Sequence, residues 1–407
     1  MWLTCRVPHP DAPGLGDLVA EPGPFLAGDL FHRAVWSPQA DGGRDPARFA
    51  TVEVLWADFL ERHYRTPFFR LVRDGTTLPS DTYCRAAGVG HRTLADVVQP
   101  NRVVELYQSG ATLVLQGLQL SDPHLGRVAN NLALALDHPV QVNAYLTPAG
   151  TKGLELHFDF HDVFVLQLDG HKRWRVWEPL ARTEMPVRDG LRPAMPTFDE
   201  LGPPLMDFTL SAGDGLYLPR GFPHAAEAVD ASSAHLTVGV MARTWQQVVR
   251  HALDAALGER ALRESLPVGT LDGRVLTAAP DLKAVAAHLD PATVRAWLAA
   301  ETWRRQPSTR LRPLVAPPID ITRPVTVTPG PLLWLTDATE AGPPRVVIGM
   351  GDRRLTLPGE ARAFLAALFE SPSGFAAGAW GGPLDRDSRQ VVLDRLAAEG
   401  VVTQAES

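Results

Sequence analysis

Histidine and carboxylate side chains in one short segment have the types and spacing of metal ligands. The segment Leu156–Asp159 has a strand-like context, and side chains two apart on a strand point to the same face. His157 and Asp159 can therefore aim at one point. An imidazole and a carboxylate are two of the three protein ligands of a non-haem Fe(II) facial triad, which leaves coordination positions open. The third ligand is expected from a distant strand.

The stretch from Gly213 to His224 supplies that ligand. It follows the pattern G-x5-P-x-G-x2-H, whose glycines and proline shape a tight turn that presents the histidine on the next strand. This pattern is the second signature of cupin barrels. We therefore expect His157, Asp159 and His224 to be the metal ligands and the catalytic centre.

The chain offers rival ligands, because it contains 13 histidines. A single histidine in a strand is more often a surface or hydrogen-bonded core residue than a ligand. His161 continues the face of the first two ligands and is the strongest rival. His171 and His235 are weaker ones.

A lysine close to these ligands suggests an anion. The Asp-Gly pair at residues 169–170 is a two-residue hairpin signal, which predicts that residues 163–168 fold back on residues 171–177. Lys172 and Trp174 then share a face. A lysine inside a barrel is costly unless it meets an anion, such as the distal carboxylate of 2-oxoglutarate. The alternative is a solvent-facing lysine at the hairpin tip.

The elements that must position these residues are mostly short strands. Strand-like runs separated by turn residues predict an antiparallel barrel or a double-sheet jelly roll. The runs are residues 111–115, 140–146, 163–168, 174–177, 207–210, 215–218 and 235–240. Helices are predicted near residues 25–36, 51–64 and 123–136.

The pattern becomes helical from Trp245, where apolar residues recur at helical spacing. A second helix is predicted from Asp290-Pro291 to Arg304, followed by a proline-rich linker over 306–330. The remaining residues alternate short strands with helices, as in a winged helix. We therefore predict three domains: a catalytic domain over 1–243 with an irregular N-terminal segment, a helical region over 244–306, and a winged-helix-like module over 307–407.

Composition excludes several classes of protein. Of 407 residues, 45% are hydrophobic and 21% charged, and the net charge is −7, so the chain is globular and not generally basic. Residues 310–406 hold ten arginines and eleven acidic residues, which does not favour nucleic-acid binding. Two cysteines cannot make a disulfide framework, and neither a signal peptide nor a membrane-spanning run is evident. A cytoplasmic protein is expected.

Three runs carry a strong resemblance to a known family: residues 142–148 (VNAYLTP), 156–159 (LHFD) and 163–176 (VFVLQLDGHKRWRV). They resemble the JmjC-type ribosomal oxygenases, bacterial members of which are Fe(II)/2-oxoglutarate protein hydroxylases of the cupin superfamily. The resemblance covers residues 110–240 tightly. It implies a mainly β, double-stranded β-helix core followed by dimerisation helices and a winged helix.

The resemblance also implies roles for single residues. Iron would be held by the three ligands named above, with 2-oxoglutarate and O2 as cosubstrates. Lys172 would bind the 2-oxoglutarate carboxylate, Asn143 and Thr237 would lie in the cosubstrate pocket, and Tyr145 would touch a substrate peptide. Family members that hydroxylate histidine carry Gln and Ser where this chain has Gly117 and Gly239, so that specificity is not carried over.

The leading hypothesis is a dioxygenase that hydroxylates a protein or peptide side chain, a ribosomal protein being one such substrate, and that acts as a homodimer. Within the same chemistry, a precursor peptide, a small molecule or an N-methyl group remain alternatives. A different class is a regulator that senses a ligand in its cupin barrel and binds DNA through the C-terminal module. A metal-dependent cupin without 2-oxoglutarate would leave Lys172 unexplained.

Overall fold

The computed structural model divides the chain into two compact units, which are described separately. The barrel unit is Pro8–Met241, and the terminal unit combines Met1–Val7 with Ala242–Ser407. The residues that the structure describes are 2–39, 44–151, 154–180, 195–265, 283–338, 342–351 and 353–404.

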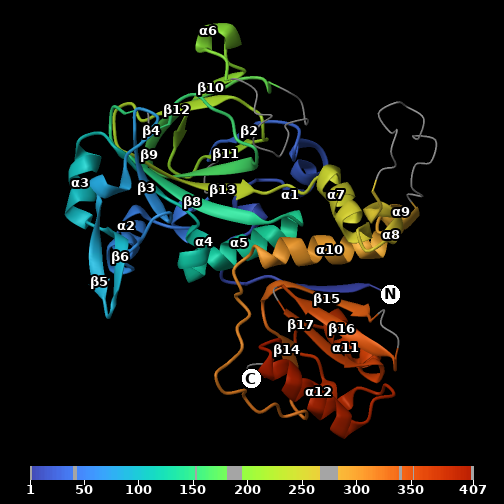
Figure 1. Ribbon diagram of the computed structural model, residues 1–407. Coiled ribbons are helices and arrows are strands. Elements are labelled where there is room, and N and C mark those ends of the chain that lie inside the picture. Colours follow the sequence, from blue (N-terminus) through green and yellow to red (C-terminus); the bar gives the residue numbers. More distant parts are fainter. Residues whose placement is uncertain are drawn as a thin grey trace, which may run out of the picture. The chain divides into compact units, whose positions relative to one another are not determined.

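The barrel unit is built on a ten-stranded antiparallel sheet (Figure 1). Its main path runs β2-β11-β9-β13-β8-β7-β3-β4, and β10 and β12 both pair with β9. The strands are β2 (Val35–Ser37), β3 (Phe69–Arg73), β4 (Thr76–Thr77), β7 (Thr112–Leu115), β8 (Val140–Thr147), β9 (Asp162–Val176), β10 (Met206–Ser211), β11 (Gly215–Leu218), β12 (His224–Glu227) and β13 (Ser233–Val240). The predicted antiparallel strands are therefore confirmed, and most lie within two residues of their expected bounds.

The hairpin predicted at residues 169–170 is wrong, because β9 runs without a break from Asp162 to Val176. Its first half pairs with β11 and β13, and its second half pairs with β10 and β12. Gly170 has a φ of +65°, and a Cβ there would overlap the carbonyl oxygen of Ser232. The register of β13 against β9 shifts between Ala234 and His235. The Asp-Gly pair therefore marks a bulged bend that carries one strand from one sheet layer into the next.

Alternation along β8 separates the two faces of the sheet. Val142 and Ala144 are fully buried, whereas Asn143 and Tyr145 are only partly covered. Helices α4 (Leu118–Ser121) and α5 (Pro123–Leu136) pack against β8. The bounds predicted for α5 are confirmed: Asp122 caps it by accepting the N–H of Leu125 at 2.8 Å, and proline occupies its first turn. The residues at 143 and 145 are thus left for the interior of the barrel.

The remaining elements of the barrel unit flank this sheet. The helix predicted over 51–64 is α2 (Val52–Glu61), and the short one predicted near 25–36 is helical only as far as Asp29. A short α1 (Pro22–Pro24) leads into this π-helical turn (Phe25–Asp29), and Val35–Ser37 then form β2 by pairing with β11. The other elements are α3 (Pro100–Gln108), α6 (Phe198–Leu201) and a two-stranded ribbon of β5 (Cys84–Val89) and β6 (Arg92–Val98).

The terminal unit contains a four-stranded sheet of order β1-β15-β16-β17. Its first strand was not predicted: β1 (Leu3–Val7) lies in the segment expected to be irregular and pairs with β15. A separate pair joins β14 to β18. The elements are β14 (Val325–Val327), β15 (Gly330–Asp337), β16 (Arg345–Met350), β17 (Arg353–Pro358), β18 (Val402–Gln404), α7 (Trp245–Ala256), α8 (Arg260–Arg263), α9 (Lys283–Ala287), α10 (Pro291–Arg304), α11 (Arg362–Glu370) and α12 (Arg386–Ala398).

No helix among the described residues has both the length and the apolar character needed to cross a bilayer.

Candidate metal and cosubstrate site

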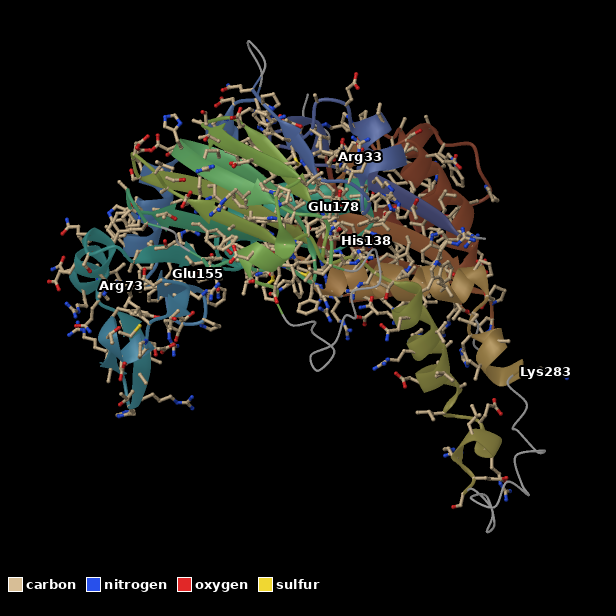
Figure 2. The ribbon with its side chains drawn as sticks, turned by 90° about the horizontal axis from the view of Figure 1, so that it is seen from above. Arg33, Arg73, His138, Glu155, Glu178 and Lys283 are labelled. Atoms are coloured by element: carbon tan, nitrogen blue, oxygen red, sulfur yellow. The ribbon has the colours of Figure 1, made fainter. Side chains whose placement is uncertain are left out.

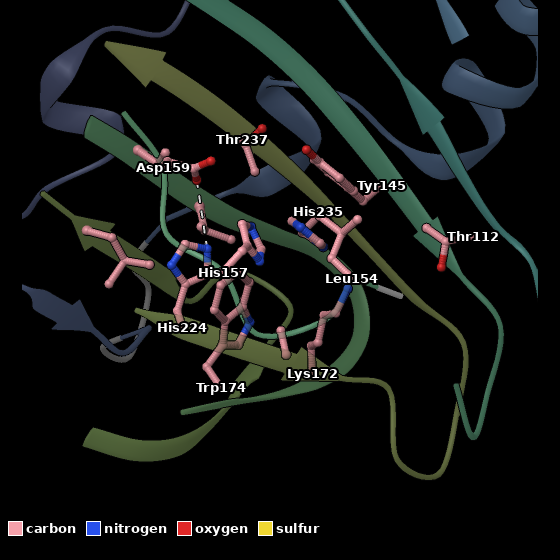
Figure 3. A pocket seen from close by; sticks show the side chains of 14 residues that line it. Thr112, Tyr145, Leu154, His157, Asp159, Lys172, Trp174, His224, His235 and Thr237 are labelled. Carbon is pink, nitrogen blue, oxygen red and sulfur yellow. Dashed lines mark ion pairs between the residues drawn. The ribbon is translucent and has the colours of Figure 1, made fainter. Parts of the chain in front are cut away.

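A pocket lies inside the barrel unit and opens to solvent (Figure 3). Its wall combines three kinds of side chain: possible metal ligands, polar groups and a few apolar residues. The lining residues are Thr112, Tyr145, Leu154, His157, Asp159, Val163, Val165, Lys172, Trp174, Leu218, His224, Ala226, His235 and Thr237. Most of the residues singled out in the sequence therefore meet in one place.

His157, Asp159 and His224 form a cluster with one ligand atom each, all within 4.8 Å of one another. The Nε2 atom of His224 lies 3.8 Å from Oδ2 of Asp159. The backbones of His157 and His224 pair directly, through N–H donation at 3.1 Å in one direction and 2.8 Å in the other. This pairing is how the structure brings two motifs, far apart in the chain, to a single point.

Hydrogen bonds fix the orientation of both imidazole rings. Nδ1 of His157 lies 2.7 Å from the carbonyl oxygen of Glu155, and Nδ1 of His224 lies 3.0 Å from that of Phe222. A carbonyl can only accept, so each Nδ1 carries a proton, and in the neutral imidazole the lone pair is then on Nε2. Metal-ligating histidines are oriented in this way by their outer partners.

Burial favours the neutral form of His224. Its side chain is buried, and burial together with the neighbouring His157 lowers the pKa of His224 to about 4. The ring therefore stays unprotonated near neutral pH. An unprotonated nitrogen is the form that binds a metal.

The rival histidines lie outside the cluster. His161 is not in it, although its ring approaches the position where a Cβ on Gly239 would stand, at 3.4 Å. His171 is exposed on β9. His235 is 3% exposed and lines the pocket, yet it too is not part of the cluster.

An ion pair joins the segment that follows Asp159 to the turn that precedes His224. Asp162, at the start of β9, has no exposed surface, and Arg220 reaches it at 3.2 Å from the turn before His224. The backbone N–H of Arg220 and the hydroxyl of Tyr217 also donate to this carboxylate. Burial nevertheless raises the pKa of Asp162, and Arg220 opposes that effect. The pair therefore compensates a buried charge that nothing else neutralises among the described neighbours.

Arg220→Ala is expected to lower the free energy of unfolding by about 3–5 kcal/mol, because it leaves the Asp162 carboxylate buried without a counter-charge. Urea unfolding followed by circular dichroism measures this loss. The double variant Arg220→Ala/Asp162→Asn should recover part of the stability. A loss below about 1 kcal/mol in the single variant would contradict the assignment.

Lys172 lies at the inner end of the pocket, with only 4% of its surface exposed. Its ammonium donates a hydrogen bond to Oγ1 of Thr147 at 3.2 Å, and this hydroxyl is neutral. Burial alone lowers the pKa of Lys172 to about 7. Lys172 therefore points into the barrel, as predicted, and does not face solvent. A buried ammonium with a neutral partner is half of an anion site.

Of the three other residues predicted for the pocket, Thr237 and Tyr145 line it and Asn143 does not. Thr237 and Arg70 are polar neighbours of the Tyr145 hydroxyl. Burial, aided by Asp159, raises the pKa of Tyr145 to about 12, so the phenol keeps its proton. Asn143 faces the same interior, but its amide oxygen accepts from the N–H of Gly117 at 3.0 Å. It is not among the described residues that line the pocket.

Sequence reasoning did not assign several lining residues to this pocket, notably Thr112 and Leu154. It considered His235 only as a metal ligand. A usable signal existed for His235, because it lies two residues before Thr237 on β13 and therefore on the same face of the strand.

Comparisons with known proteins show which proteins the barrel unit is similar to. Residues 121–248 match the model of the JmjC domain. Ribosomal oxygenase 1 of Gallus gallus is 37% identical over 197 residues, which are 48% of this chain and 32% of that protein. NO66, a bifunctional lysine-specific demethylase and histidyl-hydroxylase of Dictyostelium discoideum, is 35% identical over 175 residues, or 41% of this chain and 34% of that protein. Over this region the chain carries a JmjC domain and is similar to the ribosomal oxygenases.

The family likeness covers the barrel unit best. The chain spans about a third of the length of these curated relatives. The crystal structure of Escherichia coli YcfD superposes with a TM-score of 0.55 at 18% identity, covering 95% of this chain and 98% of YcfD. This shared fold confirms the predicted fold class, a mainly β protein with a JmjC-type core.

Proposed function

We propose that the chain is an Fe(II)- and 2-oxoglutarate-dependent dioxygenase that hydroxylates a side chain of a protein or peptide. His157, Asp159 and His224 are the metal ligands in this proposal, and Lys172 binds the cosubstrate. One observation carries it: an open His-Asp-His cluster and a buried lysine with a neutral partner share one pocket.

The donor set of the cluster fits Fe(II). Two imidazoles and one carboxylate on one side of an ion leave positions free for a cosubstrate and O2, as in the facial-triad oxygenases. Both Nε2 lone pairs are available because each Nδ1 faces a carbonyl oxygen. The backbone N–H of Gly221 also donates to the carbonyl oxygen of Asp159 at 2.9 Å. This hydrogen bond ties the turn before His224 to the segment that carries Asp159.

The inner end of the pocket fits a dicarboxylate. One end of 2-oxoglutarate would bind the metal, and the carboxylate at its other end would reach Lys172. An ion pair with that carboxylate would compensate the ammonium, which the Thr147 hydroxyl cannot do. A structure of Escherichia coli YcfD contains cobalt and 2-oxoglutarate, which supports this reading for a protein of the same fold.

The residues of this chain have distinct parts in the reaction. Iron held by His157, Asp159 and His224 would supply the oxidising chemistry with O2 and 2-oxoglutarate, which would be converted to succinate and CO2. Val163, Val165 and Leu218 line the pocket with apolar surface and limit access of water. The protonated Tyr145 hydroxyl stays a hydrogen-bond donor close to Asp159, where a substrate peptide would approach.

The names of the relatives support a protein substrate. They are ribosomal oxygenases and a histidyl-hydroxylase, so a ribosomal protein is the first substrate to test. A cytoplasmic location is part of the proposal, and it is supported by Cys5 and Cys84, which are both buried free thiols.

The experiment measures succinate. Protein loaded with Fe(II) is incubated with 2-oxoglutarate and O2, first alone and then with peptides of ribosomal proteins, whose mass is followed for a gain of one oxygen atom. Asp159→Ala is the control. Succinate that depends on iron and on Asp159 supports the proposal, and a protein that binds neither metal nor 2-oxoglutarate contradicts it.

Affinity for 2-oxoglutarate should fall as the pH rises above about 7. The pKa of Lys172 is about 7 without cosubstrate, so the ammonium that attracts the carboxylate is present below that pH and is lost above it. The dissociation constant should rise by up to about tenfold per pH unit. Titrations of the Mn(II) form between pH 6 and 8.5 test this. In Lys172→Arg the dependence should flatten, because arginine stays charged.

Dimerisation is the second part of the proposal, and it concerns α7 of the terminal unit. Val248, Ala252 and Ala256 are buried on one face of this helix, against a small cluster that includes Val285 of α9. A second apolar stripe on α7 is exposed: its residues are Trp245 (79%), Val249 (45%), Leu253 (46%) and Leu257 (52%). These residues recur every four positions, as on the contact face of a helix pair. A two-fold interface would cover them.

Leu253→Glu is expected to convert a dimer into a monomer, because it places a charge in the centre of that stripe. Light scattering should give a mass near twice 44.2 kDa for the wild type and near 44.2 kDa for the variant. Val391→Glu is the matched control, since Val391 is 68% exposed on α12 and away from the stripe along the chain. A wild-type mass near 44.2 kDa at all concentrations would contradict dimerisation.

A further inference from the structure

Lys172 is not the only polar side chain at the inner end of the pocket among the described residues. Thr147 receives the hydrogen bond from Lys172 and itself contacts the hydroxyl of Thr112 at 3.3 Å. His235 and Trp174 complete this end (Figure 3). Two of their ring nitrogens, Nδ1 of His235 and Nε1 of Trp174, are buried and have no hydrogen-bond partner among the residues that the structure describes. Buried polar atoms in a native protein normally have partners, so unsatisfied ones that line a pocket point to a ligand.

Packing holds the His235 ring in a defined place. It stacks parallel on Tyr145, with centroids 4.9 Å apart and an interplanar angle of 1°. Trp174 contacts it at 5.8 Å in an edge-to-face arrangement. The strand register explains this position, because His235 of β13 lies opposite Tyr145 of β8. The imidazole is therefore a fixed feature of the pocket wall.

The charge of His235 also suits a site shared with a lysine. Burial and the neighbouring Lys172 hold the pKa of His235 well below its usual range. The ring is therefore neutral, and it carries one N–H and one lone pair. Beside the ammonium, a neutral N–H can donate a second hydrogen bond without adding a second buried charge.

We propose that His235 is a cosubstrate-positioning residue that hydrogen-bonds the distal carboxylate of 2-oxoglutarate together with Lys172. Carboxylate oxygens accept several hydrogen bonds, and an acceptor between these side chains would satisfy the groups that the protein leaves unpaired. This inference rests on the proposed function, since it takes 2-oxoglutarate as the ligand. It goes beyond it in assigning a role to a histidine that is not part of the metal cluster.

The test compares two ligands on the Mn(II) form of the full-length protein. One is 2-oxoglutarate, and the other is oxalate, which binds a metal but has no distal carboxylate. His235→Phe keeps an aromatic ring for Tyr145 to stack on and removes the N–H. We expect roughly tenfold weaker binding of 2-oxoglutarate and unchanged binding of oxalate. His161→Phe is the matched control: it makes the same change outside the pocket lining and should alter neither affinity.

A double-variant cycle adds a readout that a merely structural role would not move. If Lys172 and His235 hold one carboxylate, the loss in Lys172→Ala/His235→Phe should differ from the product of the single losses, whereas distant independent sites would give that product. Unchanged 2-oxoglutarate affinity in His235→Phe would overturn the inference. Equal weakening of both ligands would also overturn it, because the effect would then lie at the metal. A wild-type protein that binds metal but not 2-oxoglutarate would instead refute the proposed function.

Discussion

His224→Ala is expected to abolish metal-dependent turnover. The variant loses one of three protein ligands, and the cluster has no fourth member among the described residues that could replace it. Loss of an outer partner of a ligand already costs 10–100-fold in metal affinity, so loss of the ligand itself should cost more than about 100-fold. Anaerobic Fe(II) titration and succinate formation measure the two effects. The backbone pairing with residue 157 does not need the imidazole, so the circular dichroism spectrum should be unchanged.

His161→Ala is the matched control for this prediction. His161 lies two residues after Asp159, yet it is outside the cluster. Its removal should leave metal affinity within about twofold of the wild type and should keep substantial activity. If His161→Ala were inactive and His224→Ala active, the ligand assignment would be wrong.

Lys172→Ala is expected to weaken 2-oxoglutarate binding by roughly 10–100-fold, because a charge-assisted contact in a partly dry pocket is commonly worth about 1.5–3 kcal/mol. Lys172→Arg should retain part of the affinity, since the charge survives with a different geometry. Titration of the Mn(II) form with 2-oxoglutarate gives both values. Metal affinity should hardly change, because Lys172 is not in the metal cluster.

Folding of the Lys172→Ala variant provides its own check. Burial disfavours the ammonium, so removal of this lysine should not lower the melting temperature strongly. An unchanged 2-oxoglutarate affinity in a well-folded Lys172→Ala protein would assign the cosubstrate carboxylate to another group. It would also reopen a metal-dependent reaction that does not use 2-oxoglutarate.

The cluster of His157, Asp159 and His224 could be predicted from the sequence because short-range spacing and turn signals set the positions of these residues. The two-residue spacing of His157 and Asp159 sets a common face, and the glycine–proline turn before His224 sets where the next strand begins. The helix α5 was also predictable, since Asp122 and Pro123 define its start. Each of these signals acts over a few residues.

The errors arise where distant residues override local preference. An Asp-Gly pair between alternating runs favours a two-residue turn. In β9, however, β13 pairs with the residues up to Gly170, and β10 and β12 pair with the residues after it, which keeps the chain extended. The bend at Gly170 then serves a change of layer. His235 was underrated for a related reason: its contact with Tyr145 depends on cross-strand register, which no single strand encodes.

The strand β1 has a consequence for the order in which the chain folds during synthesis. Leu3 pairs with Leu335 and Val7 with Gly330, so β1 is translated before the whole barrel unit and its partner afterwards. The barrel strands all lie within Val35–Val240 and can pair before β15 emerges from the ribosome. Throughout that interval β1 is an unpaired, partly apolar strand, which is the kind of edge that promotes wrong pairing. A tag that obstructs residues 3–7 would therefore impair the four-stranded sheet of the terminal unit and leave the barrel's own pairing untouched.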